Sequence, residues 1–339
     1  MTTTGSRTGT TVQAPGGRVL SEVLDWAKLP EGWTFCDVPG VAIGPDDRVY
    51  LMTRGNCPRS PDHPVIVLES DGTFVRAFGD NEFQFSHAIA VGVDGLLYCV
   101  DVGGHRVHVY TTEGVLVRTI AGPVSPSDTG YTTDFRTIVR GAGPFNQPTK
   151  MVTAATGDLF ASDGYGNARV HHFDPVGQLR TSWGEPGTEP GHFNIPHSVL
   201  VLPDERVLVC DRENNRIQVF SLEGRFMEEW TDLARPDDVC ADLDGNLYVA
   251  ELGERAALFP FMPRPYGHDR VARVSILDSS GRVQMRWGED SSGVQFVAPH
   301  GIAVDRHGNV YVAEVRQAGG ADPAGWRSAI RKFSPVRPG

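Results

Sequence analysis

Apolar and polar residues alternate along most of the chain, in short runs separated by glycine-containing turns. Six of these runs share one pattern: RVYLMTRG (48–55), LLYCVDVG (96–103), DLFASDGY (158–165), RVLVCDRE (206–213), NLYVAELG (246–253) and NVYVAEVR (309–316). Alternation of this kind with Asp-Gly-like turns is typical of antiparallel hairpins and not of helices. The pattern predicts an all-β protein.

Each run belongs to a longer repeat. An entry segment precedes it, near Pro39, Ser86, Pro148, Pro196, Pro236 or Pro299, and further alternating strands follow. Six units of four short strands predict a six-bladed β-propeller, in which radial repetition leaves only short sheet edges.

The last unit lacks its fourth strand, because the chain ends within five residues of Lys332-Phe333-Ser334. The segment GGRVLSEVLDW (16–26) has the fourth-strand pattern, so we expect it to complete the last blade and hide two open edges. The expected organisation is a disordered tail at 1–15 and one propeller domain at 16–339.

Aligning the six units brings one position into register just before each first strand. It is occupied by Gly40, His87, Thr149, His197, Asp237 and His300. A lone histidine is usually a core residue, but histidines on alternate blades, about 120° apart in a six-bladed ring, converge on the axis. Three imidazoles with an open fourth position are typical of catalytic zinc; iron, cobalt or copper also fit such ligands.

The loops after the second strands lie at the same end of each blade as these histidines. Their acids, Asp101, Asp163, Asp211, Glu251 and Glu314, are of a kind that holds turn amides. Arg54 and Arg212 suit a carboxylate substrate, which a guanidinium binds in a bidentate manner. We expect Tyr165, beside a metal and two cations, to ionise below its usual pKa of about 10 and to serve as a base.

Three segments in particular resemble the peptidylglycine α-amidating lyase family of NHL-repeat propellers: DGYGNAR (163–169), FNIPHS (193–198) and DRENNRIQVF (211–220). The resemblance extends more loosely through Arg54, the His87 entry and APHGIAVD (298–305), and so covers most of the chain. It implies zinc ligands at His87, His197 and His300, a catalytic tyrosine at Tyr165 and arginines at Arg54 and Arg212. The implied reaction cleaves a carbinolamide, R–CO–NH–CH(OH)–COO⁻, to an amide and glyoxylate.

The chain departs from the family at several positions. The acidic residue that follows the third histidine in the animal enzymes, and serves a structural calcium, is Gly301 here, so a calcium site does not carry over. Two half-cystines of the family are also missing, near Gly166 and Val219. The substrate is therefore expected to be a small carboxylate-bearing N-substituted α-hydroxy acid, not a peptide hormone.

Composition restricts the partners and the location. The net charge is −11 with no basic run, which speaks against nucleic acid and anionic membranes. No apolar run reaches the length of a membrane span, and residues 1–17 lack a signal-peptide core. The five cysteines are odd in number and form no paired motif, which favours a reducing cytoplasm.

Two insertions, 123–144 and 254–271, interrupt the repeats. The second is expected on the metal face, where six of its residues would form a lid, a pocket wall or simply a packed loop: Phe259, Phe261, Met262, Arg264, Tyr266 and His268.

Two functions other than the lyase activity remain open. One is a propeller metallohydrolase of the lactonase or esterase type; the other is a non-catalytic NHL binding or scaffold protein.

Overall fold

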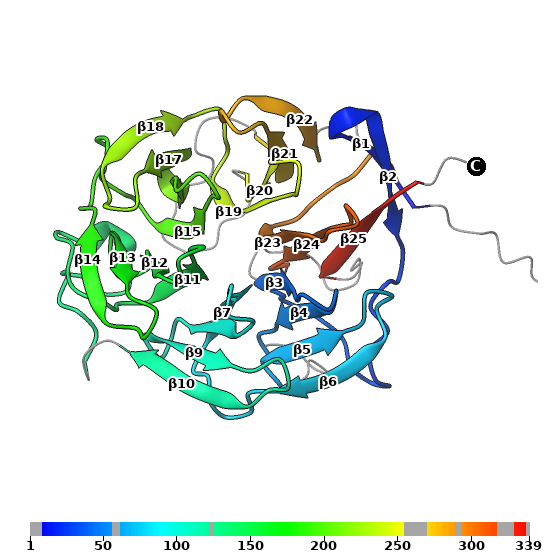
Figure 1. Ribbon diagram of the computed structural model, residues 1–339, viewed down its shortest axis with the longest axis horizontal. Coiled ribbons are helices and arrows are strands. Elements are labelled where there is room, and N and C mark those ends of the chain that lie inside the picture. The colour runs from blue at the N-terminus through cyan, green and yellow to red at the C-terminus, as the bar shows by residue number, and fades with distance from the viewer. Residues whose placement is uncertain are drawn as a thin grey trace, which may run out of the picture.

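The computed structural model describes residues 9–55, 62–121, 125–253, 270–288, 293–316 and 329–336. These residues form six antiparallel sheets arranged around a central axis, with the inner strand of each sheet closest to that axis (Figure 1). The predicted six-bladed propeller is confirmed.

Each of the first five blades takes its strands in chain order from the inside outward. The first three blades are β3 (Gly40–Ile43), β4 (Val49–Met52), β5 (Val65–Leu68) and β6 (Phe74–Phe78); β7 (Ser86–Val91), β8 (Leu97–Asp101), β9 (Arg106–Tyr110) and β10 (Leu116–Ala121); and β11 (Pro148–Thr153), β12 (Leu159–Asp163), β13 (Arg169–Phe173) and β14 (Leu179–Trp183). The fourth and fifth are β15 (Pro196–Val201), β16 (Val207–Asp211), β17 (Arg216–Phe220) and β18 (Phe226–Trp230); and β19 (Pro236–Ala241), β20 (Leu247–Glu251), β21 (Arg273–Leu277) and β22 (Val283–Trp287).

The sixth blade joins the two ends of the chain. It runs β23 (Pro299–Val304), β24 (Val310–Glu314), β25 (Ile330–Pro335), β2 (Arg18–Val23) and β1 (Thr11–Ala14). The antiparallel pairing of β2 with β25 confirms the predicted ring closure. The expected disordered tail at 1–15 is wrong in its last part, because β1 adds a fifth strand whose residues Val12 and Ala14 are buried in the core. Residues 1–8 lie outside the described chain.

Among the described residues, six large hydrophobic clusters lie one at each interface between neighbouring blades, and two smaller clusters lie elsewhere. Ile89 and Cys99 of the second blade pack on Tyr50 and Met52 of the first, and the same arrangement recurs around the ring. The inner strands contact one another in a closed circle from β3 through β23 and back to β3. Because this packing is closed, it fixes how far the side chains of the inner strands lie from the axis.

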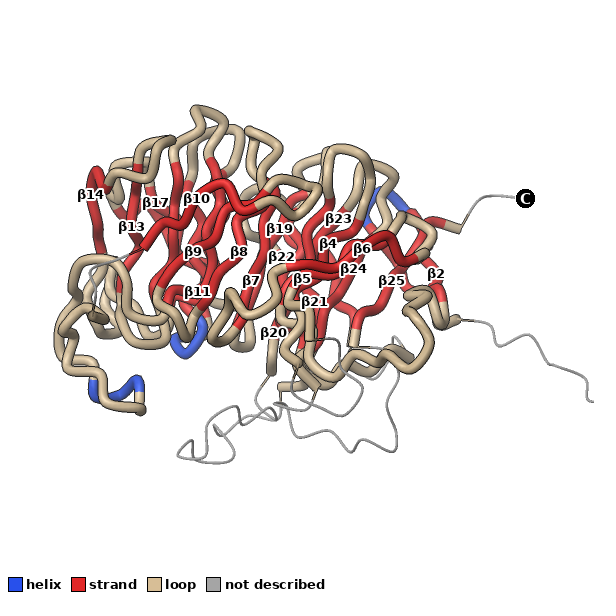
Figure 2. Tube along the Cα trace, turned by 90° about the horizontal axis from the view of Figure 1, so that it is seen from below, coloured by secondary structure: helices blue, strands red, loops and turns tan. Residues whose placement is uncertain are grey.

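All strands run between two opposite faces of the ring (Figure 2). Each inner strand begins at the face where the second strand ends, as the antiparallel pairing requires. We call this the entry face. It also carries the 3-10 helix η3 (Arg212–Asn214), which directly follows β16, and η2 (Phe135–Thr137), which precedes β11. The third 3-10 helix, η1 (Pro15–Gly17), joins β1 to β2.

The cysteines differ in part from expectation. Cys99, Cys210 and Cys240 are free and lie within strands, as predicted for small apolar core residues. Cys36, in contrast, is buried and disulfide-bonded, and Cys57 lies outside the described residues. Separately, no helix among the described residues is both long and apolar enough to cross a membrane.

Candidate metal centre

The aligned register position coincides with a β-bulge in five of the six blades. The pairing of inner and second strands shifts around His87, Thr149, His197, Asp237 and His300. A bulge leaves one residue unpaired and redirects its side chain. The repeat therefore supplies a backbone irregularity that frees these five side chains from the sheet at the entry end of the channel.

Each of the three histidines is oriented by a hydrogen bond to the blade that follows it. The Nδ1–H of His87 donates to the carbonyl oxygen of Thr149 at 2.7 Å, and that of His197 to the carbonyl oxygen of Asp237 at 2.8 Å. His300 donates in the same way to Pro39 at 2.7 Å. Because a carbonyl only accepts, Nδ1 carries the proton and the Nε2 lone pair remains available to a metal.

The three imidazoles converge in a nearly equilateral arrangement. Their ring centroids are 4.9 Å apart for His87–His197 and 4.8 Å apart for the two pairs with His300. One nitrogen from each ring lies within 4.8 Å of the others, and all three side chains are buried. The structure thus brings together the predicted metal ligands from three alternate blades.

Burial keeps these histidines neutral. It lowers the pKa of His87, His197 and His300 well below 6.5, and the positive charge of Arg212 acts in the same direction on all three. A neutral imidazole is the form that binds a metal, so no proton has to leave the ligands at neutral pH.

Nε2 of His300 and Oδ2 of Asp237 are buried at this centre and have no hydrogen-bond partner among the residues that the structure describes. They face each other at 3.7 Å. Leaving such atoms unpaired is costly, and a divalent cation coordinated by the three Nε2 atoms would satisfy the first and place a positive charge beside the second. The donor set therefore fits a metal ion, and imidazole nitrogen suits zinc in particular.

Tyr165 lies directly over the histidines, on the loop after β12. Its hydroxyl is 2.9 Å from Nε2 of His197 and 3.0 Å from Nε2 of His87. Burial raises the pKa of Tyr165 above its ordinary value of 10.0, although Arg212 and Arg54 oppose this effect. The two arginines alone therefore do not lower this pKa, because their effect does not outweigh desolvation. The expected lowering, which included a bound metal, stays a prediction.

Arg212 is fully buried and belongs to a network of charges. Its Nε donates to Glu213 at 2.9 Å, and its Nη1 donates to Oδ1 of Asp237 at 3.2 Å and to the Tyr165 hydroxyl at 3.4 Å. Glu213 in turn accepts from the buried Arg235 at 2.8 Å. Arg212 thus holds Tyr165 in place while its own charge is neutralised by two carboxylates.

Arg54 has a different environment. It follows β4, its guanidinium stacks on the Phe85 ring at 4.7 Å, and its Nε donates to the Ser86 carbonyl at 3.4 Å. Desolvation lowers its pKa below the usual 12.5. Together with Thr53, Phe83 and Phe85 it lines a cavity of about 300 Å³, which we call the Arg54 cavity. Of the two predicted arginines, Arg54 is therefore the one that faces open space.

The acids after the second strands behave as the structural interpretation predicted. Oδ1 of Asp101 accepts from the Phe85 amide at 2.9 Å, and Oδ1 of Asp211 accepts from the Asn194 amide at 2.7 Å. Asp163, Glu251 and Glu314 accept amide protons of their own entry segments in the same way. They rigidify the entry segments that carry the histidines.

Sequence reasoning placed Asp237 in the aligned ring but gave it no role, and it missed Glu213 and Arg235. Burial raises the pKa of Asp237 to about 7, against the opposing effect of Arg212. The signal that could have identified Asp237 was a carboxylate at the same repeat position as the three histidines. Nothing in the local pattern marked Glu213 or Arg235, because their meeting depends on how blades four and five pack. The proposed lid residues between Phe259 and His268 lie outside the described residues.

Comparison with known proteins agrees with the repeat pattern. The model of the NHL repeat matches residues 193–220. The chain is 30% identical to human NHL repeat-containing protein 3 over 311 residues, which covers 86% of this chain and 80% of that protein. It is 28% identical over 272 residues to peptidyl-α-hydroxyglycine α-amidating lyase 1 of Drosophila melanogaster, covering 74% of this chain and 47% of the relative.

A longer relative matches in one part only. The chain is 30% identical over 281 residues to rat peptidylglycine α-amidating monooxygenase, covering 79% of this chain but only 26% of that protein. The chain therefore spans about a quarter of this relative. Among solved structures, a gluconolactonase from Xanthomonas campestris has a TM-score of 0.61 at 12% identity, covering 97% of this chain and 95% of its own, which is a similarity of fold alone.

Proposed function

Because the chain belongs to the family of NHL-repeat propellers that includes NHL repeat-containing protein 3 and the peptidyl-α-hydroxyglycine α-amidating lyases, we propose that it is a metal-dependent carbon–nitrogen lyase. Its substrate would be a carbinolamide, an N-substituted α-hydroxy acid, cleaved to an amide and glyoxylate or a related aldehyde. The observation that carries the proposal is the convergence of three neutral histidines beneath the hydroxyl of Tyr165.

His87, His197 and His300 would hold the metal, which we propose to be zinc. When bound, such an ion supplies a Lewis acid that polarises an oxygen of the substrate. Asp237 balances the charge of this centre, since its Oδ2 lies 3.7 Å from Nε2 of His300 and its Oδ1 accepts from Arg212. A carboxylate oxygen this close to a ligand nitrogen supports a cation at this place.

Tyr165 is the proposed proton acceptor for the substrate hydroxyl. Its oxygen lies within 3.0 Å of two ligand nitrogens, so a hydroxyl directed at the histidines would come within hydrogen-bond reach of it. Arg212, whose Nη1 donates to the tyrosine oxygen at 3.4 Å, and a cation held by the histidines would together favour the phenolate form against the opposing effect of burial. As the hydroxyl proton passes to Tyr165, the carbonyl of the aldehyde forms and the carbon–nitrogen bond breaks. The amide nitrogen then receives the proton that Tyr165 accepted, so the tyrosine returns to its starting form.

Arg54 is the proposed anchor for the substrate carboxylate. It faces a cavity, whereas the two carboxylates of Glu213 and Asp237 already neutralise Arg212. A guanidinium binds a carboxylate through two parallel hydrogen bonds and so fixes its orientation. Arg212 is then a positioning residue for Tyr165, a narrower role than the shared carboxylate binding expected from the sequence.

The other interpretations have less support. A propeller hydrolase of the lactonase type typically uses hard oxygen ligands for calcium, and three imidazoles are softer donors. A binding or scaffold role has no need for a buried tyrosine over three converging histidines. Neither nucleic acid nor a membrane is part of the proposal. The predicted cytoplasmic location stays a prediction, and the disulfide at Cys36 weighs against it because such bonds persist mainly in oxidising compartments.

The test combines metal analysis with an assay. Purified protein is expected to contain about one zinc per chain, and the zinc-loaded protein should release glyoxylate from α-hydroxyhippurate. Tyr165→Phe should keep the metal and lose turnover. If the zinc-loaded protein releases no glyoxylate, the lyase assignment is wrong; if it binds no zinc or other transition metal, the metal centre is wrong as well.

A further inference from the structure

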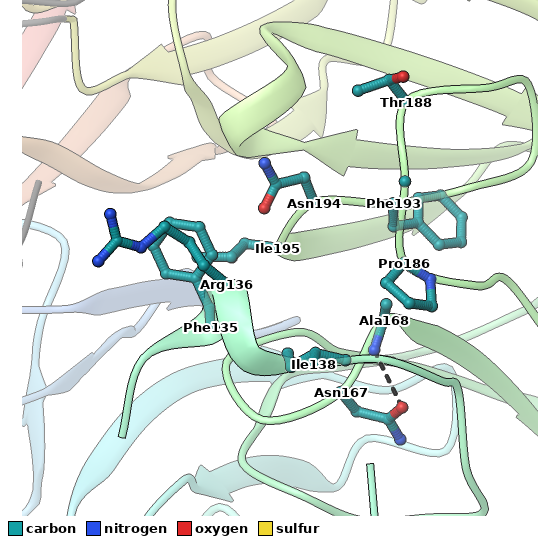
Figure 3. Close-up of a pocket in the computed structure, with 11 residues that line it drawn as sticks. Phe135, Arg136, Ile138, Asn167, Ala168, Pro186, Thr188, Phe193, Asn194 and Ile195 are labelled. Atoms are coloured by element: carbon teal, nitrogen blue, oxygen red, sulfur yellow. Dashed lines mark hydrogen bonds between the residues drawn. The ribbon is translucent and has the colours of Figure 1, made fainter. Parts of the chain in front are cut away.

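We propose that the acyl group of the substrate binds in a second cavity on the entry face, and that this group is uncharged and apolar. The cavity has a volume of about 290 Å³ and lies between the third and fourth blades (Figure 3). We call it the acyl cavity. The inference rests on the proposed lyase function and adds the substrate class to it.

The acyl cavity shares a wall with the catalytic centre. Phe135 and Ile195 line it and are buried together, and the Tyr165 ring packs against this pair. Ile195 stands two residues before His197, and its carbonyl oxygen accepts the amide proton of Arg212 at 3.0 Å. A group bound in the cavity would therefore contact Phe135 and Ile195, the two residues against which the Tyr165 ring packs.

The two entry-face cavities have positions that suit the two arms of a carbinolamide. The Arg54 cavity lies between blades one and two, and the acyl cavity lies two blades further around the ring. The histidines stand at the axis between them. In R–CO–NH–CH(OH)–COO⁻ the carboxylate and the acylamino group leave the carbinol carbon in different directions. With the carboxylate on Arg54 and the hydroxyl over the histidines, the acyl group extends toward the third and fourth blades.

The walls of the acyl cavity favour apolar groups. Phe135, Ile138, Phe193 and Ile195 contribute apolar surface. The charge of Arg136 is matched by Asp134, to whose two carboxylate oxygens its Nε donates at 2.9 Å each. A charged acyl group would lose its hydration here without gaining a dedicated counter-ion among the described lining residues, which is costly.

The polar groups of the cavity suit a single neutral amide. Asn167 is fully occupied by local partners: its Oδ1 accepts from the amides of Ala168 and Ala142, and its Nδ2 donates to Asp163. Asn194, in contrast, extends toward the Phe135 side of the cavity in Figure 3. It can pair with the substrate's amide group while the apolar walls enclose R.

The volume restricts the size of this acyl group. Ligand pockets of proteins span roughly 300 to 1,000 Å³, so a cavity of about 290 Å³ lies at the lower end of that range. It suits a benzoyl or branched aliphatic acyl group, and it is small for several residues of a peptide. The cavity thus gives a structural reason to expect a small-molecule substrate.

The experiment compares two substrates that differ only in the acyl group. The zinc-loaded protein is assayed for glyoxylate release from α-hydroxyhippurate, which carries benzoyl, and from N-acetyl-α-hydroxyglycine. Burial of the phenyl ring should raise kcat/KM for the benzoyl substrate about tenfold or more over the acetyl substrate. A ratio near one would overturn the proposed subsite.

Substitutions at two adjacent positions test whether the acyl cavity causes the preference for the benzoyl substrate. Ile138→Trp reduces the space in the acyl cavity and should lower the benzoyl-to-acetyl ratio, mainly through KM for the benzoyl substrate. Val139→Trp is the matched control, because Val139 is 68% exposed and is not a lining residue. If Ile138→Trp does not fold, as judged by thermal unfolding, Thr188→Trp at the exposed rim of the same cavity takes its place. An unchanged ratio in the folded cavity variant would contradict the assignment.

A binding measurement separates failure of this inference from failure of the lyase function. Titration calorimetry with hippurate and with N-acetylglycine needs no turnover. If neither hydroxylated substrate is cleaved but hippurate binds more tightly, and Ile138→Trp removes the difference, the lyase function fails and the acyl cavity stands. If cleavage occurs with no acyl preference in binding or turnover, the acyl cavity fails and the lyase function stands.

Discussion

Two successive rings of side chains line the central channel, and they differ in how well their polar groups are satisfied. The first is the ring of His87, His197 and His300. The second consists of the residues that follow three of the aligned positions, Lys150, Ser198 and Asp238, and we call it the ion-pair ring. Both border the same narrow space, whose free volume is only about 10 Å³.

The charged and polar groups of the ion-pair ring are paired within the protein. Lys150 of the third blade forms an ion pair with Oδ1 of Asp238 of the fifth, which also accepts from the Ser198 hydroxyl of the fourth at 2.7 Å. Oδ2 of Asp238 accepts the amide proton of Ile302, in the sixth, at 3.1 Å. This ring thus links four blades, and its acceptors and donor have partners within the protein.

The histidine ring, by contrast, leaves the Nε2 of His300 and the Oδ2 of Asp237 buried without a hydrogen bond to any described residue. The difference indicates a division of tasks along one channel. Buried atoms that offer a lone pair without a hydrogen-bond partner suit a site that binds an external ion. Charged side chains that pair within the protein instead cross-link the blades. Substitutions in each ring test whether the two rings have these separate roles.

The largest expected effect comes from removing a ligand. His197→Ala should lower metal affinity by more than about 100-fold, the upper end of the effect of removing even an outer-shell partner of a ligand, and should abolish glyoxylate release. Elemental analysis and the α-hydroxyhippurate assay measure the two losses. His307→Ala, at an exposed histidine paired with Asp47, is the control and should change neither. Full metal content in His197→Ala would show that the histidines are not the ligands.

Breaking the ion-pair ring should affect stability instead. Lys150→Met leaves the Asp238 carboxylate buried without its cation, which costs about 3–5 kcal/mol of unfolding free energy. The double variant Lys150→Met/Asp238→Asn should recover much of this loss, because it buries no unpaired charge. Denaturant unfolding measures the free energy, and zinc content should stay that of the wild type. Loss of zinc in the single variant, with the fold intact, would argue against separate tasks.

A side chain at position 301 tests the expectation that no calcium binds there. A Cβ there would lie 3.0 Å from Cα of Gly40 and 3.1 Å from the Pro39 oxygen, both backbone atoms. Gly301→Asp should therefore destabilise the protein by about 1–3 kcal/mol. Gly301→Ala separates the effect of the Cβ from that of the carboxylate. Melting temperatures with and without calcium should agree for all three proteins, and a calcium-dependent rise in the aspartate variant alone would show a latent site.

The smallest effect concerns pH. In metal-free protein the three histidines have folded pKa values well below the unfolded value of 6.5. Below pH 6.5 the unfolded chain therefore binds more protons, so stability is fully present above this pH and is lost as the pH falls through it. Melting temperatures from pH 8 to pH 5 should show a steeper decline for metal-free wild type than for a His87→Asn/His197→Asn/His300→Asn variant. Equal slopes would contradict burial of neutral histidines.

The carboxyl group of Asp237 partly opposes this loss of stability at falling pH. Its folded pKa of about 7 lies above the ordinary aspartate value of 3.8. The stability it contributes is therefore fully present at low pH and is lost as the pH rises through 7. Asp237→Asn should make the decline of the metal-free protein between pH 7 and pH 5 steeper.

Much of the fold followed from the repeat. The six second strands, the aligned entry position and the missing last strand were all readable in the sequence, because the four-stranded unit recurs with the same turns. The strand β1 was missed, since TVQA is short and lies in a polar terminus with no repeat to compare it with. The disulfide of Cys36 was also missed, because pairing depends on distances that spacing alone does not give.

The sequence by itself determined which side chains reach the axis. The position of a residue within a repeated unit decides its place around the ring, so His87, His197 and His300 could be assigned to one point. The tertiary structure alone decided how their neighbours behave. It buried Arg212 between Glu213 and Asp237, left Arg54 facing a cavity, and enclosed a second cavity beside Tyr165. These properties arise where different blades and loops pack together, and such contacts depend on three-dimensional distances that no local pattern encodes.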